Sequence, residues 1–198
     1  MTRLVLGSRN AHKVAEIKRF FAPLGVEVEA LPADIPEAVE DRETFRGNAA
    51  KKAEEYARAT GALVLADDSG LEVDALDGAP GVISARYAGE PKSDARNNEK
   101  LLAELADVAE EARGARFVCV MALADPQGLR LVVEGALPGR ILPALRGDGG
   151  FGYDPLFLLP EDGRSLAELG PDEKNAISHR GRALERVRVA LPAILGEA

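Results

Sequence analysis

Cysteine is nearly absent from this chain: Cys119 is the only one among 198 residues. A single cysteine excludes an intrachain disulfide and a cysteine-rich metal site, and its place in the apolar run 117–124 predicts a buried free thiol. Only two histidines are present, so the chain has no Cys/His cluster for zinc. The expected compartment is reducing, which favours the cytoplasm.

Positive charge is also scarce, with 25 basic against 33 acidic residues and a formal net charge of -8. The net negative charge of the protein repels phosphodiester backbones, so we expect no nucleic-acid partner. A small basic pocket is compatible with this net charge. Runs of roughly 18 apolar residues are missing, and the N-terminal stretch Leu4–Leu6 is too short for a secretory signal. We therefore expect no membrane association.

The chain is long enough for one compact domain with a substantial core, covering residues 1–198. Apolar runs and alternation predict strands at residues 3–6, 26–31, 62–66, 116–124, 129–136 and 156–159, with residues 71–73 and 83–87 as short strands or turns. Helical spacing predicts helices between Asn10 and Pro23, from Thr44 to before Gly61, from Ser93 to Val108, and from about Ser178 to Leu195. Parallel-type connections and a hairpin at residues 125–128 together predict an α/β fold with a mixed sheet.

A polar turn, Ser8-Arg9-Asn10-Ala11-His12-Lys13, joins the first strand to the first helix. Backbone N–H groups at a helix N-terminus attract anions, and Lys13 adds a charge in the first turn, so a phosphate fits there. The turn is not a P-loop. Taken alone, it is more often an ordinary capped helix with a surface lysine.

Two adjacent carboxylates, Asp67 and Asp68, follow the predicted strand 62–66 and precede Ser69-Gly70. Neighbouring side chains on a strand point to opposite faces, so only one enters a given site while the other turns into the structure and needs partners. Such a carboxylate suits Mg²⁺ or a general base. A plain turn without a function is the alternative. Two adjacent acids repel each other unless a cation or a basic group offsets their charge, so a functional role is the favoured interpretation.

An acidic segment containing Glu40 precedes the second helix, and most of its carboxylates should be solvated. One of them is a candidate second metal ligand. On the helix that follows, Lys52 lies beside the apolar stripe, where a surface position is the default.

A glycine-rich loop, 149–155, carries two of the chain's few aromatic residues, Phe151 and Tyr153, next to Asp154. Aromatic faces plus one carboxylate acceptor suit a purine pocket, with a structural loop as the alternative. Further along, Lys174, His179 and Arg180 gather at the predicted start of the last helix as a cluster of donors.

In order and spacing, the segments 8–13, 67–71, 150–155 and 177–181 resemble the inosine/xanthosine triphosphate pyrophosphatase family over essentially the whole chain. The resemblance implies an elongated, two-lobed α/β protein with a long mixed sheet, flanking helices and a central cleft. It implies Mg²⁺-dependent hydrolysis of deaminated purine nucleoside triphosphates (ITP, dITP, XTP) to the monophosphate and pyrophosphate. A homodimer in the cytoplasm, cleansing the nucleotide pool, is also implied.

The resemblance also assigns roles residue by residue. Asp68 is the implied general base and metal-linked carboxylate, with Glu40 as second metal ligand. The implied substrate contacts are Ser8, Arg9, Asn10, Ala11, His12, Lys13, Lys52, Ser69, Phe151, Gly152, Tyr153, Asp154, Lys174, His179 and Arg180.

Three alternative functions stay open. The nearest is a related hydrolase that acts on other modified nucleotides. A nucleotide-binding regulatory module without turnover would use the same pocket but would leave the Asp67–Asp68 pair unexplained. A single-stranded nucleic-acid binder is disfavoured by the net charge.

Overall fold

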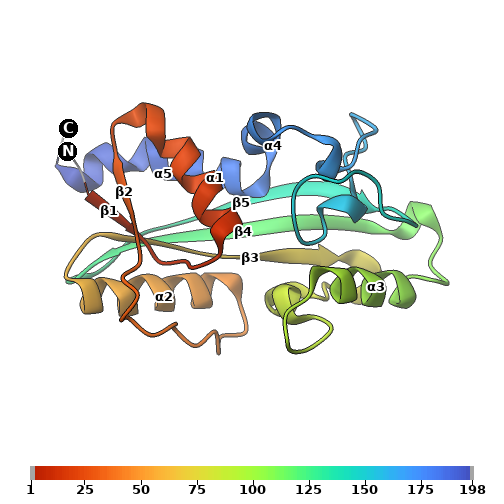
Figure 1. Cartoon of the computed structure of the whole chain (residues 1–198), viewed down its shortest axis with the longest axis horizontal. Helices are drawn as coiled ribbons and strands as arrows, with labels where there is room; N and C mark the ends of the chain where they lie inside the picture. The colour runs from red at the N-terminus through yellow and green to blue at the C-terminus, as the bar shows by residue number, and fades with distance from the viewer. Residues whose placement is uncertain (1–2, 197–198) are drawn as a thin grey trace. The chain divides into compact units, whose positions relative to one another are not determined.

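The computed structural model describes residues 3–196, in which six strands form one mixed sheet in the order β2-β1-β3-β4-β5-β6 (Figure 1). The strands are β1 (Arg3–Leu6), β2 (Glu27–Ala30), β3 (Val64–Val73), β4 (Gly114–Asp125), β5 (Gly128–Ile141) and β6 (Phe157–Leu158). β1 runs parallel to both β2 and β3, whereas β5 and β6 are antiparallel. The predicted α/β class with a mixed sheet is confirmed.

Five α-helices accompany the described strands: α1 (Ala11–Phe21), α2 (Phe45–Thr60), α3 (Asp94–Glu104), α4 (Pro171–Ile177) and α5 (His179–Leu195). Local sequence explains their starts. The side chains of Asn10, Thr44 and Ser93 each accept a hydrogen bond from a backbone N–H in the first turn of α1, α2 and α3. Gly61, in the left-handed conformation, ends α2 as expected. None of the helices in this part of the chain has the length and apolar character needed to cross a membrane.

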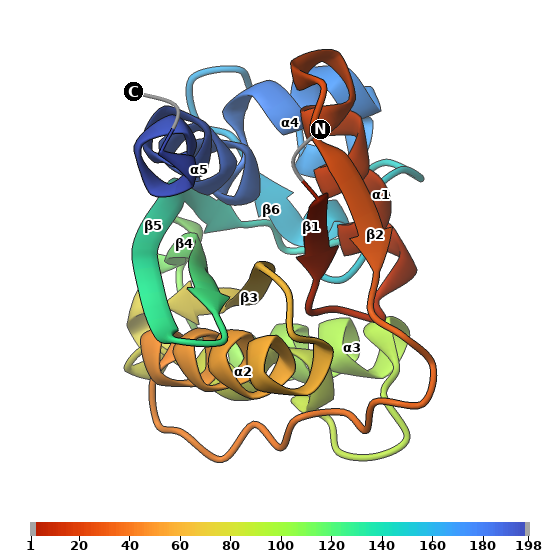
Figure 2. The same ribbon diagram turned by 90° about the vertical axis from the view of Figure 1, so that its left-hand side faces the viewer.

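The described chain divides into two compact units, and β3, β4 and β5 contribute to both. Unit 1 comprises residues 3–68, 119–135 and 179–196, and unit 2 comprises residues 69–118 and 136–178. Within unit 1, α1 and α5 lie on one face of the strands and α2 on the other (Figures 1 and 2). Apolar side chains of α1 and α5, with those of β1, β3 and β4, form the core of the first face.

Unit 2 has its own apolar core. Residues from α3 and from β3, β4 and β5 pack there against the segment that includes Tyr153, Leu156 and Phe157. The glycine-rich loop therefore ends within this buried cluster and is held by it.

Several predicted boundaries are wrong, among them that of the strand predicted at residues 129–136, which as β5 continues to Ile141. The strand predicted to end at residue 66 continues through Asp67 to Val73, so the adjacent carboxylates lie within β3 rather than in a turn at its end. The extended conformation persists because Leu71 and Val73 resume the apolar pattern and are fully buried. The segment 83–87 lies largely within a 3₁₀ helix, Gly81–Arg86, in which the Ser84 hydroxyl donates to the Gly81 carbonyl at 2.6 Å.

The third helix ends at Glu104, four residues earlier than predicted. The guanidinium of Arg113 donates to the carbonyls of Leu105 and Val108 at 2.8 and 2.9 Å, so these acceptors are satisfied without a further helical turn. The last predicted helix is preceded by a separate helix, α4, because Ser178 adopts an extended conformation between Ile177 and His179.

Candidate active site

The polar turn 8–13 is pinned at the N-terminus of α1. The Asn10 Oδ1 atom accepts from the backbone N–H groups of His12 and Lys13 at 3.0 and 3.3 Å, and Ser8 Oγ accepts from the Asn10 N–H at 3.3 Å. At Gly7 a Cβ atom would lie only 2.7 Å from the Tyr56 ring, so β1 leaves the sheet in close contact with α2. This close contact fixes the point at which the turn that carries Ser8 and Lys13 leaves β1.

Arg9 is directed away from the strands toward a neighbouring loop. Its guanidinium donates to the carbonyls of Pro32 and Ala33 at 3.3 and 3.2 Å, and also to that of Ile35. Arg9 therefore ties the turn after β2 to the start of α1, and its contact with substrate stays a prediction.

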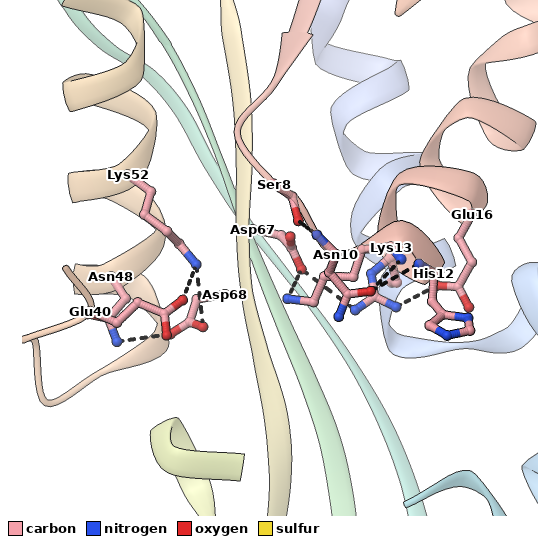
Figure 3. A network of polar contacts seen from close by, with 11 residues as sticks. Ser8, Asn10, His12, Lys13, Glu16, Glu40, Asn48, Lys52, Asp67 and Asp68 are labelled. Carbon is pink, nitrogen blue, oxygen red and sulfur yellow. Dashed lines mark hydrogen bonds and ion pairs between the residues drawn. The ribbon is translucent and has the colours of Figure 1, made fainter. Parts of the chain in front are cut away.

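Asp67 lies in a buried network of charges on the face covered by α1 and α5. Its Oδ2 atom is 2.8 Å from Lys13 Nζ (Figure 3). The same atom is 3.6 Å from Arg180 Nη2, and Arg180 also contacts Glu16. Asp67 and Arg180 are each only 2% exposed. Burial acts to raise the pKa of Asp67, but Lys13 and Arg180 outweigh it and hold that pKa well below its ordinary value.

Asp68 projects to the opposite face of β3, toward α2. Asn48 Nδ2 donates to its Oδ2 atom at 3.0 Å, and Lys52 Nζ lies 3.6 Å from Oδ1 and donates to Glu40 Oε1 at 2.7 Å (Figure 3). Asn48 also accepts from the Arg42 N–H at 2.9 Å, which anchors the segment that carries Glu40. The prediction that adjacent carboxylates face opposite sides and take separate partners is confirmed.

The electrostatic states of this second cluster differ from those around Asp67. Burial raises the pKa of Asp68, Lys52 opposes the rise, and Glu40 adds to it. The pKa of Lys52 is also raised, because Asp68, Asp67 and Glu40 together outweigh its burial. Lys52 is 6% exposed, so the default surface position is wrong for this residue.

Glu40 and Asp68 form an oxygen donor set that suits Mg²⁺. Both carboxylates lie against the one ammonium of Lys52. Residues 3–196 contain no group of three or more His, Cys, Asp or Glu side chains arranged for a metal. Mg²⁺ commonly binds through one or two carboxylates, with waters and substrate phosphates completing its shell, so two carboxylates fit this ion.

The glycine-rich loop is organised around Asp154, which is 2% exposed. Its Oδ2 atom accepts from the Phe151 N–H at 2.8 Å and from Lys174 Nζ at 2.7 Å, and the Lys174 ammonium stands 4.5 Å from the centre of the Phe151 ring. Gly150 and Gly152 have φ of 70° and 62°, the left-handed region that favours glycine. Glycine is therefore required at both positions by the path of the loop.

Tyr153 belongs to the core of unit 2. Its hydroxyl donates to the Ser84 carbonyl at 2.8 Å, and burial raises its pKa. Tyr153 thus anchors the loop, whereas the Phe151 ring is partly exposed.

The donors expected to cluster at the start of the last helix enter two networks. Lys174, on α4 in unit 2, pairs with Asp154, whereas Arg180, on α5 in unit 1, pairs with Glu16 and Asp67. His179 is buried, and its carbonyl approaches Gly135 of β5 so closely that a Cβ there would lie 2.1 Å away. The remaining predicted contacts, Ala11 and Ser69, lie at the first residue of α1 and on β3.

Sequence reasoning missed Glu16 and Asn48 as members of these networks, and it missed Asn98, whose Nδ2 donates to the Gly152 carbonyl at 2.9 Å. Asparagine is a weak helix former, and the adjacent pair Asn97-Asn98 inside an amphipathic helix is the signal that points to a role beyond helix formation. A Pro171 at the first position of α4, followed by two acids, similarly marks the helix that sequence reasoning missed.

A mixed α/β sheet whose third strand carries the adjacent acids Asp67 and Asp68, each paired with a lysine, defines the class of this protein. The Ham1 family model matches residues 4–190, and the chain belongs to that family. It is 51% identical over 197 residues to a dITP/XTP pyrophosphatase of Exiguobacterium sibiricum, with 98% of this chain and all of the relative covered. A dITP/XTP pyrophosphatase of Geobacillus kaustophilus is 52% identical over 198 residues, covering 99% and 97%.

Solved structures agree with these relatives. A HAM1 protein from Coxiella burnetii superposes with a TM-score of 0.88 at 42% identity, with both chains fully covered. A nucleoside-triphosphatase, dITP/XTP pyrophosphatase, from Mycobacterium abscessus gives a TM-score of 0.75 at 47% identity, covering 94% of this chain and 98% of that one. The family resemblance drawn from the four motifs is confirmed.

Proposed function

We propose that this protein hydrolyses deaminated purine nucleoside triphosphates, namely ITP, dITP and XTP, to the monophosphate and pyrophosphate in the presence of Mg²⁺. The names of relatives at about half identity over nearly the full length support the substrate class. The observation that carries the proposal is the placement of Asp68 and Glu40 against one buried lysine, Lys52.

In the proposed reaction Asp68 is the general base. It takes a proton from the water whose oxygen attacks the α-phosphorus, and the bond from that phosphorus to the α,β-bridging oxygen breaks to release pyrophosphate. Lys13 and Lys52 offset the charge on the phosphate oxygens. Mg²⁺, held by Glu40 and Asp68, supplies further charge neutralisation when bound.

The loop 151–154 provides recognition of the base. The partly exposed Phe151 ring offers a stacking face, and Lys174 and Asp154 offer a donor and an acceptor beside it. Deaminated purines carry an oxygen at position 6 where adenine carries an amino group, so the Lys174 donor beside Phe151 favours them over adenine. Arg180 is engaged by Asp67 and Glu16, and its contact with the base, like that of His179, stays a prediction. The turn 8–13, Ser69, Gly152 and Tyr153 complete the proposed contacts.

Pyrophosphate release from a panel of substrates tests this function. We expect efficient turnover of ITP, dITP and XTP, far slower turnover of ATP, GTP, CTP and UTP, and loss of activity in excess EDTA. Asp68→Asn serves as the control for contaminating hydrolases. Turnover confined to another modified nucleotide, or nucleotide binding without turnover, would replace the proposal with a related hydrolase or a regulatory module.

We also propose that the protein is a cytoplasmic homodimer. The family resemblance supports the dimer, and a single buried thiol suits a reducing compartment. Light scattering of the purified chain at micromolar concentration checks the dimer, and a monomer mass would reject it.

A further inference from the structure

Helix α3 holds one residue of the glycine-rich loop from both sides. The Oδ2 atom of Asp94 accepts from the Gly152 N–H at 2.7 Å, and Asn98 Nδ2 donates to the Gly152 carbonyl at 2.9 Å. Asp94 and Asn98 are four residues apart on α3, so they project from the same side of the helix. We call these two residues the Gly152 clamp.

The clamp restrains the residue of the loop that has the most conformational freedom. Gly152 has φ of 62°, and as a glycine it has more conformational freedom than any other residue. The residues on either side are already fixed, since the Phe151 N–H donates to Asp154 and the Tyr153 hydroxyl donates to Ser84. The clamp thus removes the remaining freedom between the stacking ring of Phe151 and the buried ring of Tyr153.

Asn98 lowers the stability of the folded protein relative to an apolar residue at the same position. It is 6% exposed, and its Oδ1 atom is buried with no hydrogen-bond partner among the residues that the structure describes. A buried acceptor left unsatisfied opposes folding, and leucine at this position would avoid that cost and favour the helix. Within residues 3–196, the Asn98 side chain makes one hydrogen bond, to the Gly152 carbonyl, and this bond is the reason for an amide here.

We propose that Asp94 and Asn98 are positioning residues that set the affinity for the purine base by holding the loop 151–154 in its stacking conformation. This inference rests on the proposed function, because it takes Phe151 as the stacking face. Neither residue touches the reacting phosphates in this scheme, so their loss weakens base binding and leaves the chemical step intact.

The test compares Asn98→Leu with wild type and with Glu99→Leu, a matched change at the neighbouring exposed position of α3. Loss of one hydrogen bond predicts a KM for ITP raised about 3- to 10-fold in Asn98→Leu, with kcat changed less than about twofold. Glu99→Leu should leave both constants unchanged. A lower kcat at unchanged KM would overturn the proposal.

Binding measurements distinguish an effect on the affinity for the base from an effect on the affinity for the phosphates. Calorimetry should show weaker binding of inosine monophosphate to Asn98→Leu, while the inhibition constant of inorganic triphosphate, which has no base, stays at the wild-type value. Equal weakening of both probes would indicate general disruption and reject a positioning role. Asp94→Ala provides a second variant, since Asp94 is exposed and its truncation spares the core; it should shift the same two measurements in the same direction.

The two proposals fail separately. If wild type releases no pyrophosphate from ITP, the proposed function is wrong, yet inosine monophosphate binding still decides the role of the clamp. If wild type turns over ITP and both variants bind inosine monophosphate as tightly as wild type does, the clamp has no role in base affinity.

Discussion

The adjacent aspartates of β3 allow one chemical change to be made on two faces of the same strand. Asp67→Asn removes a buried charge that faces the partly buried Lys13 at 2.8 Å and the buried Arg180 at 3.6 Å. Breaking a buried ion pair by removing one partner costs about 3 to 5 kcal/mol. Because Glu16 still contacts Arg180 and asparagine keeps the shape, we expect the low end, about 3 kcal/mol. For a chain of this length that is a fall in Tm of about 6 to 12 °C.

Asp68→Asn is the matched control and should behave in the opposite way. Burial raises the pKa of Asp68, so its ionised form gains nothing from the fold, and asparagine still offers an oxygen to Asn48. We expect a Tm within about 2 °C of wild type and a kcat lower by about 10² to 10⁴, because an amide accepts no proton from water.

The pH dependence of the Tm gives a second check on Asp67. Its pKa in the folded state lies well below the ordinary value, so its contribution to stability is complete above the ordinary pKa of about 3.9 and is lost as the pH falls toward the folded-state value. The Tm difference between wild type and Asp67→Asn should be constant from about pH 5 to 8 and shrink below about pH 4. Calorimetric melting measures it. An Asp67→Asn variant that melts with wild type at pH 7 would refute the assignment of Asp67 to stability.

Three further outcomes are expected. Gly150 has φ of 70°, and an alanine Cβ there would lie 2.1 Å from Asp154 Oδ2. Gly150→Ala should therefore raise the KM for ITP about 10-fold or more in steady-state assays. An unchanged KM would show that Asp154 has no part in base binding. Burial raises the pKa of Cys119 to about 12, so iodoacetamide should label the thiol at pH 8 in urea but not in the native protein, as mass spectrometry reads out. Thr44→Ala should cost about 1 kcal/mol in urea unfolding, because the Gly47 N–H loses its acceptor, while Thr44→Ser should be near neutral.

Local sequence is sufficient for the features that depend on near neighbours. The starts of the helices after Asn10, Thr44 and Ser93 and the stop at Gly61 are predicted correctly, because a helix end is set by hydrogen bonds between residues two to four positions apart. Where a side chain beyond the helix bonds the backbone, the local prediction is wrong: Arg113 donates to the carbonyls of Leu105 and Val108, which were predicted to lie within the helix.

The sequence by itself determined that Asp67 and Asp68 face opposite sides, since side chains alternate along any strand. It also determined the family, through four motifs in one order. The resemblance singled out Asp68 as the base, but only the tertiary structure decided which partners each aspartate takes: α1 and α5 supply Lys13 and Arg180 to Asp67, and α2 supplies Lys52 to Asp68. Lys13, Lys52 and Arg180 lie far apart in sequence, and no local sequence pattern predicts which helix covers which face of β3.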